Sequence, residues 1–315
     1  MKIKPVLLAS IDLTDDSFFT GIKGGISPIR DSISEIGLIN FPVLREFDGR
    51  LQVVTGWKRI LAAKELGCDE ITSKLYESHE LSDESCLKYI YHDNSGRMDD
   101  MELAELLVRF RDILGVGDRE MINNTLPFLG VPPSRKQLDR LTGLAALDDS
   151  VKYAYYRERI TVEQCEMLSE TAVSLSPAAF ARLIDGYKLN NNESRQVIKD
   201  IEEIVLRDGL STEEFLNELR ARAEGGGKDG LIAELKKIRY PARTRIEETY
   251  AEAFDNLSLP ESVTIHIGPY SEGNDIEIHI KAGSAEELSG ALSALESATN
   301  DGRIRKLISI AREGE

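Results

Sequence analysis

The sequence contains only three cysteines, and their spacing excludes several classes of site. Cys68, Cys86 and Cys165 are far apart and form no CxxC pair, and no histidine lies at metal-ligand spacing from them. A disulfide framework, a zinc site or another metal site is therefore not predicted. We interpret the three residues as reduced, structural thiols of a cytoplasmic protein.

Long apolar runs are also lacking. No stretch approaches the roughly 18 apolar residues of a membrane-spanning helix, so no membrane association is predicted. The apolar run after Met1 is too short for a signal peptide and leads into Asp12, Asp15 and Asp16, so we expect it to form the first strand. With 315 residues, 41% of them hydrophobic, the chain can form two or three globular domains.

Positive charge is scarce relative to negative charge. The formal net charge is −16, and acidic residues exceed basic ones in every third of the chain. This balance argues against a simple nucleic-acid binder. Phosphate responds to the charges within a Debye length of about 10 Å, so a contact with DNA would depend on a local basic patch.

The fold class predicted is α+β with several domains. Residues 1–98 form an α/β domain, in which Ser27–Leu38 and Trp57–Leu66 have helix start and stop signals that include Pro28, Gly37 and Gly67. β-branched and apolar residues predict the strands. The predicted strands are Val6–Ile11, Phe41–Glu46, Leu51–Thr55 and Ile71–Leu75.

Residues 99–223 are predicted to form an all-helical middle domain. Apolar residues recur on one face of Met101–Leu114, and shorter helices follow, each bounded by Gly, Pro, Asn or Asp. No strict repeat indicates a solenoid. The shorter helices predicted are Arg119–Phe128, Ser134–Thr142, Asp149–Arg157, Val162–Ser169, Pro177–Tyr187, Glu193–Asp208 and Thr212–Arg222.

The glycine-rich segment 224–230 is predicted to be a linker to a C-terminal domain, residues 231–315. That domain begins with a helix, Leu231–Leu257, broken near Pro241, and ends with a β-β-α pattern. The strands Ser262–Ile267 and Asp275–Lys281 alternate in polarity, so an antiparallel pair is expected. Helices Ser284–Ser297 and Arg303–Arg312 complete the pattern.

The candidate binding motif is Gly56-Trp57-Lys58-Arg59, between a predicted strand and a predicted helix. Glycine lets the backbone approach a phosphate, and the first N–H groups of a helix attract anions. Lys58 and Arg59 oppose the helix dipole unless an anion is bound, and with one they form charge-assisted hydrogen bonds. The alternative is an ordinary strand–helix turn with solvated charges.

The motif and its surroundings resemble the N-terminal domain of ParB proteins. The resemblance covers about 90 residues and consists of SISEIGL at 32–38, Pro42-Val43, a strand, and GWKRILAAKELG at 56–67, in the family's order and spacing. Asp93-Asn94-Ser95-Gly96-Arg97 resembles the ENxxR phosphate motif of the family. Sulfiredoxin shares this fold, but its reaction requires a cysteine in the loop where Trp57 and Lys58 stand here.

The resemblance implies that CTP binds with Mg²⁺ through Gly56, Lys58, Arg59, Asn94 and Arg97. For Asn94 and Arg97 the alternative is helix-capping chemistry. Trp57 stands where the family usually has Glu, and Leu61 where many members have Arg. These departures argue against efficient CTP hydrolysis, so at most weak CTPase activity is expected.

The resemblance also implies a helix-turn-helix at 118–147, where Arg135, Lys136 and Arg140 would contact DNA. A solvated helix face is the alternative for these three residues. Pro127 falls within the first helix of the motif, which makes the motif irregular. The C-terminal β-β-α unit resembles the dimerisation domain of partition proteins, so a homodimer is expected.

The sequence therefore predicts a ParB-like DNA-associated protein for partition, nucleoid organisation or regulation. Such a protein would be cytoplasmic and associated with the nucleoid, and a ParA-like ATPase is an expected partner. One alternative is a nucleotide-independent regulator or adaptor with the same fold. The other is a ParB-like nuclease or phosphotransferase, against which the lack of a metal-binding carboxylate cluster argues.

Overall fold

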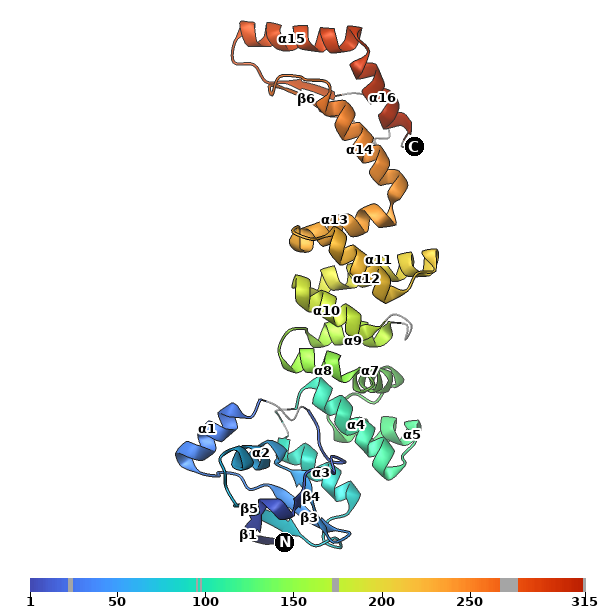
Figure 1. The fold of residues 1–315 in the computed structure, drawn as a ribbon. Helices are drawn as coiled ribbons and strands as arrows, with labels where there is room; N and C mark the ends of the chain where they lie inside the picture. Colours follow the sequence, from blue (N-terminus) through green and yellow to red (C-terminus); the bar gives the residue numbers. More distant parts are fainter. Residues whose placement is uncertain (22–24, 95, 97, 172–175, 267–276, 314–315) are drawn as a thin grey trace. The chain divides into compact units, whose positions relative to one another are not determined.

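The computed structural model describes residues 1–21, 25–94, 96, 98–171, 176–266 and 277–313, and it divides into two compact units. The first unit is Met1–Ile198 and the second is Lys199–Glu315. The division falls inside one helix, α11 (Asn191–Asp208), whereas the predicted domain boundaries lie at 98 and 223. Figure 1 labels the elements of both units.

The first unit begins with a five-stranded sheet of order β1-β5-β3-β4-β2. β1 pairs with β5 and β3 with β4 in antiparallel fashion, whereas β3–β5 and β2–β4 are parallel pairs. Asp48 and Gly49 join β3 to β4 with positive φ at both residues, which suits a two-residue hairpin. The strands are β1 (Lys2–Leu7), β2 (Ile11–Asp12), β3 (Val43–Phe47), β4 (Arg50–Thr55) and β5 (Glu70–Tyr76).

The first predicted strand, Val6–Ile11, is wrong in its bounds. β1 ends at Leu7, a 3₁₀ turn (η1, Leu8–Ser10) follows, and Ile11 begins β2. β1 and β2 lie at opposite edges of the sheet, so the chain crosses from one edge to the other through this turn. The sequence predicted one continuous strand because the run from Val6 to Ile11 is largely apolar. In the structure Val6 and Ile11 are both buried in the same core cluster, although they belong to different strands.

Helices cover the sheet on both faces. α2 (Trp57–Glu65) contributes Trp57 and Ile60 to a core cluster with Leu44 and Val53 of the sheet. The side chain after Leu44 points to the other face, because side chains alternate along a strand. That residue, Arg45, bonds the start of α3 (Asp83–Asn94), so α3 covers the opposite face. α3 was not predicted from the sequence.

α1 (Ser27–Ile36) packs against α2 and buries none of its side chains completely. Pro28 lies in its first turn, and Gly37 ends it with φ of 77°, as predicted. Ile26 rather than Ser27 is the N-cap residue, and it makes no side-chain capping bond. One apolar face of α1 is therefore left to line the space beside α2.

The rest of the first unit is helical, as predicted. The predicted helix Arg119–Phe128 is present but contains a π-helical turn, η2 (Met121–Thr125), just before Pro127. Proline lacks an N–H and clashes with the carbonyl four residues earlier, which accounts for the widened turn. The helices are α4 (Asp100–Leu114), α5 (Asp118–Glu120), α6 (Leu126–Phe128), α7 (Arg135–Ala145), α8 (Asp149–Tyr156), α9 (Val162–Glu170) and α10 (Pro177–Tyr187).

The predicted linker at 224–230 is instead a tight turn between two packed helices. α12 (Thr212–Arg222) is followed by a turn in which Gly226 N–H bonds the Ala223 carbonyl, and α13 (Gly227–Arg239) begins at once. A Cβ on Gly226 would lie 2.8 Å from the Gly230 Cα, so close backbone approach requires glycine here. A glycine-rich segment is compatible with a flexible linker and also with a tightly packed turn. The sequence alone did not distinguish these two interpretations.

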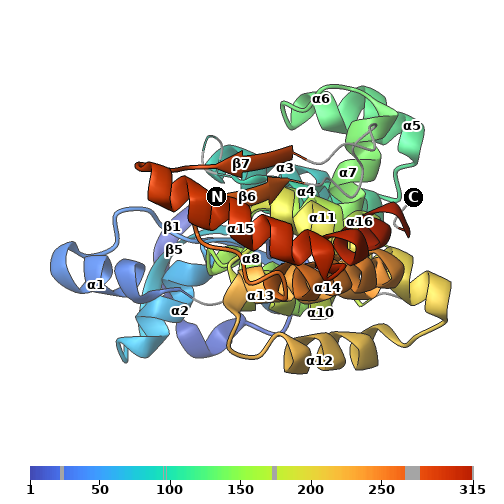
Figure 2. The same ribbon diagram turned by 90° about the horizontal axis from the view of Figure 1, so that it is seen from above.

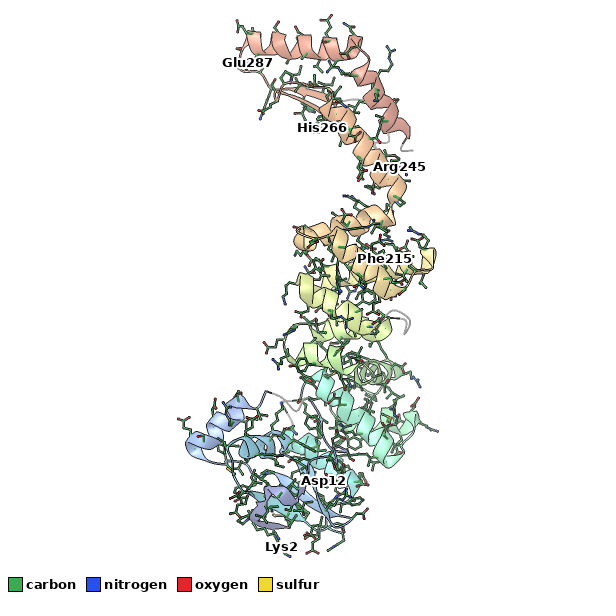
Figure 3. All side chains as sticks on the ribbon, in the orientation of Figure 1. Lys2, Asp12, Phe215, Arg245, His266 and Glu287 are labelled. Atoms are coloured by element: carbon green, nitrogen blue, oxygen red, sulfur yellow. The ribbon has the colours of Figure 1, made fainter. Side chains whose placement is uncertain are left out.

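The predicted break at Pro241 is confirmed, because α14 (Pro241–Asp255) begins there. β6 (Val263–His266) and β7 (Glu277–Ile280) form the predicted antiparallel pair (Figure 2). α15 (Ala285–Asn300) and α16 (Arg303–Glu313) follow, and the second has its apolar face in a core cluster with α14. His266 and Glu287 can be located in Figure 3, where His266 lies on β6 and Glu287 in the first turn of α15. Among the described residues, no helix has the length and apolarity needed to cross a bilayer.

Candidate functional site

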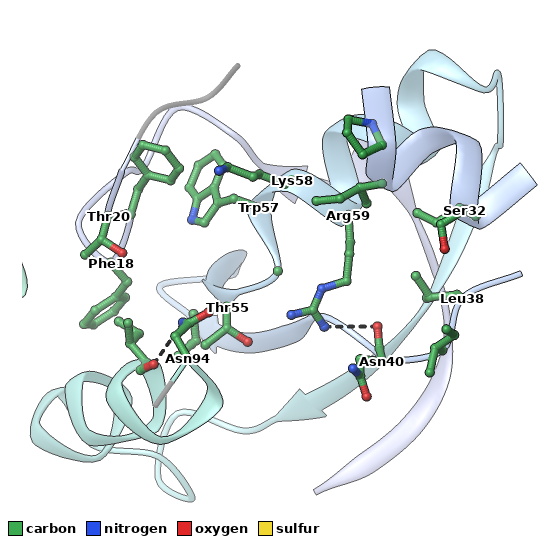
Figure 4. Close-up of a pocket in the computed structure, with 18 of the residues that line it drawn as sticks. Phe18, Thr20, Ser32, Leu38, Asn40, Thr55, Trp57, Lys58, Arg59 and Asn94 are labelled. Atoms are coloured by element: carbon green, nitrogen blue, oxygen red, sulfur yellow. Dashed lines mark hydrogen bonds between the residues drawn. The ribbon is translucent and has the colours of Figure 1, made fainter. Parts of the chain in front are cut away.

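A cavity of about 470 Å³ lies beside the N-terminus of α2 (Figure 4). Its walls come from four parts of the first unit: residues 18–20, the apolar face of α1 with residues 37–40, the end of β4, and the first turn of α2. Ile90 and Asn94 of α3 and Glu102 of α4 complete the lining. The cavity therefore has an apolar side on α1 and a polar side on α2.

Gly56 makes the turn from β4 into α2. Its φ is 90° and its ψ is 21°, a left-handed conformation that glycine adopts without strain. A Cβ at this position would lie 2.9 Å from both the Cα and the Cβ of Pro42. Gly56, Trp57 and Lys58 all line the cavity, so the N-terminus of α2 lies at its wall.

Thr55 is a candidate ligand contact that the sequence analysis missed. Its side chain is 4% exposed, and its Oγ1 atom is buried without a hydrogen-bond partner among the described residues. Because a buried hydroxyl is costly to leave unpaired, this atom is suited to bond a ligand in the cavity that Thr55 lines. Its place directly before Gly56 was the only available sequence signal.

The predicted contact Arg59 is already occupied by the protein. Its guanidinium donates to the backbone carbonyls of Asn40, at 3.0 Å, and Phe41, at 3.3 Å. It also pairs with Asp93 at 3.3 Å. Arg59 thus ties the 40–41 segment and α3 to α2, while Lys58, also in the lining, belongs to the polar wall.

Asn94 also lines the cavity, at the end of α3, and its amide donates to the Ile90 carbonyl at 2.9 Å. Arg97 lies outside the described residues. Helix capping, the alternative role for this region, is performed by the nearby Asp99, which caps α4 and forms a capping box with Glu102. Asn94 and Arg97 as ligand contacts stay predictions.

Residues 15–21 form a wall that is bonded to both the sheet and α4. Gln52 donates to the Asp15 carboxylate at 2.6 Å. Arg109 of α4 donates to the Phe19 carbonyl, and the Gly21 N–H donates to Glu105, both at 2.6 Å. A second cavity of about 460 Å³ lies behind this wall and shares Phe19 with the first. These hydrogen bonds to the sheet and to α4 hold residues 15–21 between the two cavities.

Burial shifts the protonation of the α4 side chains near this wall. Desolvation raises the pKa of Glu102 and the pKa of Glu105 above the ordinary value of a glutamate. Desolvation also lowers the pKa of Arg109, against the attraction of Glu105. Carboxylates held in this way bind cations and hydrogen-bond donors strongly, because few water molecules compete.

The segment 118–147, predicted to be a helix-turn-helix, contains α5, η2 and α6 followed by α7 (Figure 1). Arg135 is 66% exposed and pairs with Asp118 at 2.7 Å and Asp139 at 2.8 Å. Arg140 is 26% exposed and pairs with Asp100 and Glu166, which joins α7 to α4 and α9. Lys136 is exposed. Two of the three predicted DNA contacts are therefore already bonded to carboxylates.

The described residues contain no cluster of three or more His, Cys, Asp and Glu side chains that could hold a metal ion. The three cysteines are free thiols. Burial raises the pKa of Cys86 and of Cys165 to about 12, so both are protonated at neutral pH. Cys68 is exposed, in contrast to the structural role predicted for it.

The fold defines an α/β module with a cavity beside the N-terminus of α2, joined to helices. No family model and no curated protein matches the chain. Several solved structures resemble it, among them three structures of ParB proteins. They are a C-terminally truncated chromosome-partitioning protein ParB from Caulobacter crescentus complexed to the centromeric parS site, the same truncated protein complexed with CTP-gamma-S, and a Pnob8-like ParB-N domain.

The first match has 18% identity and a TM-score of 0.33, and it covers 62% of this chain and 98% of the other. The second has 20% identity and a TM-score of 0.27, covering 58% and 99%. The third has 14% identity and a TM-score of 0.40, covering 76% and 97%. The chain thus resembles ParB structures at low identity, as the sequence predicted.

Proposed function

We propose that this chain is a ParB-like DNA-associated protein whose cavity beside α2 binds the phosphates of a nucleotide, with CTP as the expected ligand. The observation that carries the proposal is the Thr55 hydroxyl at the end of β4, which is buried and has no hydrogen-bond partner among the described residues. The positive end of the α2 helix dipole favours an anion there. Lys58 adds a positive charge, and the apolar face of α1 suits a base or sugar.

Calorimetric titration of the full chain with CTP, and with ATP for comparison, tests this proposal. Thr55→Val removes the hydroxyl with little change in shape, so nucleotide affinity should fall about tenfold while the fold is retained. Lys58→Ala should weaken binding by a similar factor. Lys64→Ala is the matched control, because Lys64 lies in the last turn of the same helix and outside the cavity lining.

Arg59→Ala is a poor test of the pocket. It would leave the Asn40 and Phe41 carbonyls without their donor and so disturb the wall itself. Absence of CTP and ATP binding by the wild-type protein would refute the proposal. Equal binding by wild type and Thr55→Val would show that the hydroxyl is not a ligand.

DNA is the proposed macromolecular partner, through α7. Lys136 is exposed at the start of this helix, whereas Arg135 and Arg140 are paired with carboxylates. We expect salt-sensitive binding of duplex DNA that weakens in Lys136→Ala, measured by fluorescence anisotropy at two ionic strengths. No binding at low salt would contradict this part of the proposal. Binding would place the protein on the nucleoid, where a ParA-like ATPase is an expected partner.

A nucleotide-independent adaptor is the second candidate. It is supported by the pairing of Arg135 and Arg140, since charges already neutralised by carboxylates contribute little to phosphate binding. In that case CTP and DNA would both fail to bind.

A homodimer through residues 231–315 stays part of the main proposal. Leu288 and Leu292 of α15 lie exposed four residues apart, as an apolar contact would require. Light scattering of the full chain tests it, and a monomer at all concentrations would refute it.

A further inference from the structure

Glu102 is the only acidic side chain among the described residues that line the cavity beside α2. It lies on α4, outside every motif that the sequence analysis connected with the pocket. The other charged residues of the lining are Lys58 and Arg59, and Arg59 is taken up by Asn40, Phe41 and Asp93. The polar wall thus presents one available cation and one carboxylate to a ligand.

The position of the Glu102 carboxylate is fixed. Its Oε2 atom accepts from the Asp99 N–H at 3.4 Å in the capping box of α4. Its Oε1 atom lies where a Cβ on Gly21 would come within 3.2 Å, so a larger residue at 21 would crowd it. Withdrawal of the carboxylate would break its bond to the Asp99 N–H and so remove one half of the capping box.

A fixed carboxylate repels the phosphates that the rest of this wall attracts. An ionised Glu102 offsets the charge of Lys58, and a metal-free nucleoside triphosphate adds several further negative charges. A divalent cation on the phosphates reverses the effect, since Mg²⁺ is commonly held between carboxylates and substrate phosphates. Burial strengthens both the repulsion and the attraction, and it also raises the pKa of Glu102.

We infer that Glu102 is a specificity-determining residue of the cavity, which accepts a nucleoside triphosphate only with its divalent cation and rejects the metal-free form. The inference rests on the proposed nucleotide binding and deepens it. It assigns the selection between metal-bound and metal-free nucleotide to a residue of α4. The same carboxylate belongs to the capping box of α4, so the start of this helix would be in contact with the bound nucleotide.

Titration of the full chain with CTP, once with Mg²⁺ and once with EDTA, tests the inference. The wild-type protein should bind at least tenfold more weakly in EDTA. Glu102→Gln should bind metal-free CTP at least fivefold more tightly than wild type and should lose most of the dependence on Mg²⁺. Glutamine also serves at this position of a capping box, and a neutral side chain suits the buried site, so the variant should fold.

Glu35→Gln is the matched control, because Glu35 is exposed on α1 and lies outside the lining. Its CTP affinity and Mg²⁺ dependence should equal those of wild type. CTP binding with the same Mg²⁺ dependence in wild type and Glu102→Gln would overturn this inference alone. Absence of CTP binding in both solutions by wild type and Glu102→Gln would overturn the proposed function together with it.

Discussion

Gly56 lies against Pro42 so closely that a Cβ added at position 56 would stand 2.9 Å from the Pro42 Cα. Pro42 immediately precedes β3, and Gly56 joins β4 to α2. This close contact places the N-terminus of α2 beside the cavity. Gly56 is therefore needed both for the left-handed turn and for the close packing of α2 against Pro42.

Gly56→Ala should destabilise the first unit by about 3 kcal/mol, because a left-handed residue and a backbone clash are combined. Trp57 is the only tryptophan and is buried in the core of this part, so its fluorescence during urea denaturation measures the change. Gly67→Ala at the other end of α2 is the control. It also has positive φ but no atom within 4 Å of a new Cβ, so about 1 kcal/mol is expected. Equal losses would show that the Pro42 contact relaxes freely.

Arg45→Met should destabilise the same part by about 3 kcal/mol. The guanidinium is 3% exposed and bonds Asp83 at 2.8 Å, the Leu81 carbonyl at 3.0 Å and Gln52 at 2.6 Å. Removing it leaves the buried Leu81 carbonyl and the buried Gln52 amide oxygen without this donor. The same urea titration measures the effect.

Arg50→Met is the control for Arg45, since Arg50 is exposed and pairs with Asp12 at 3.2 Å. It should cost less than about 1 kcal/mol, as exposed pairs do. A similar loss in both variants would mean that the Arg45 network does not depend on burial.

Arg140→Met should lower stability by about 1–2 kcal/mol, because this partly buried side chain joins three helices through Asp100 and Glu166. Arg135→Met should cost less than about 0.5 kcal/mol, because that side chain and its partners are exposed. Calorimetric unfolding of the two variants measures the contrast. If Arg140→Met were as stable as wild type yet lost DNA affinity, the side chain would contact DNA instead.

Asp12→Asn should destabilise the protein at neutral pH, with a loss that narrows as pH falls. Hydrogen bonds from Thr14 and Arg50 lower the pKa of Asp12 from 3.8 to about 2. A lowered pKa in the folded state means that the stabilisation is present above pH 3.8 and is lost as pH falls towards 2. Urea midpoints of both proteins from about pH 7 to pH 3 measure it.

Thr14→Val is the companion variant for Asp12, since it removes the 2.6 Å hydroxyl bond. The pKa of Asp12 should then move back towards 3.8. A constant difference between Asp12→Asn and wild type across the whole pH range would show that the carboxylate charge contributes nothing.

Local patterns in the sequence predicted most of the elements. Pro28 and Gly37 bound α1, Gly56 begins α2, and Pro241 separates α13 from α14. These signals work because proline and glycine restrict or release the backbone regardless of tertiary context. α3 was missed, since its buried residues Cys86, Leu87 and Ile90 lie among polar neighbours with no such stop signal.

The sequence by itself determined the strand–turn–helix around Gly56, because φ preference, capping and apolar periodicity act over a few residues. Tertiary structure alone decided what surrounds it. It paired Arg59 with the 40–41 carbonyls and Asp93, engaged Arg140 between two acidic residues, and brought Glu102 into the cavity from α4. Side chains that are far apart in sequence meet only when helices pack, and their partners then determine whether a charge is available to a ligand.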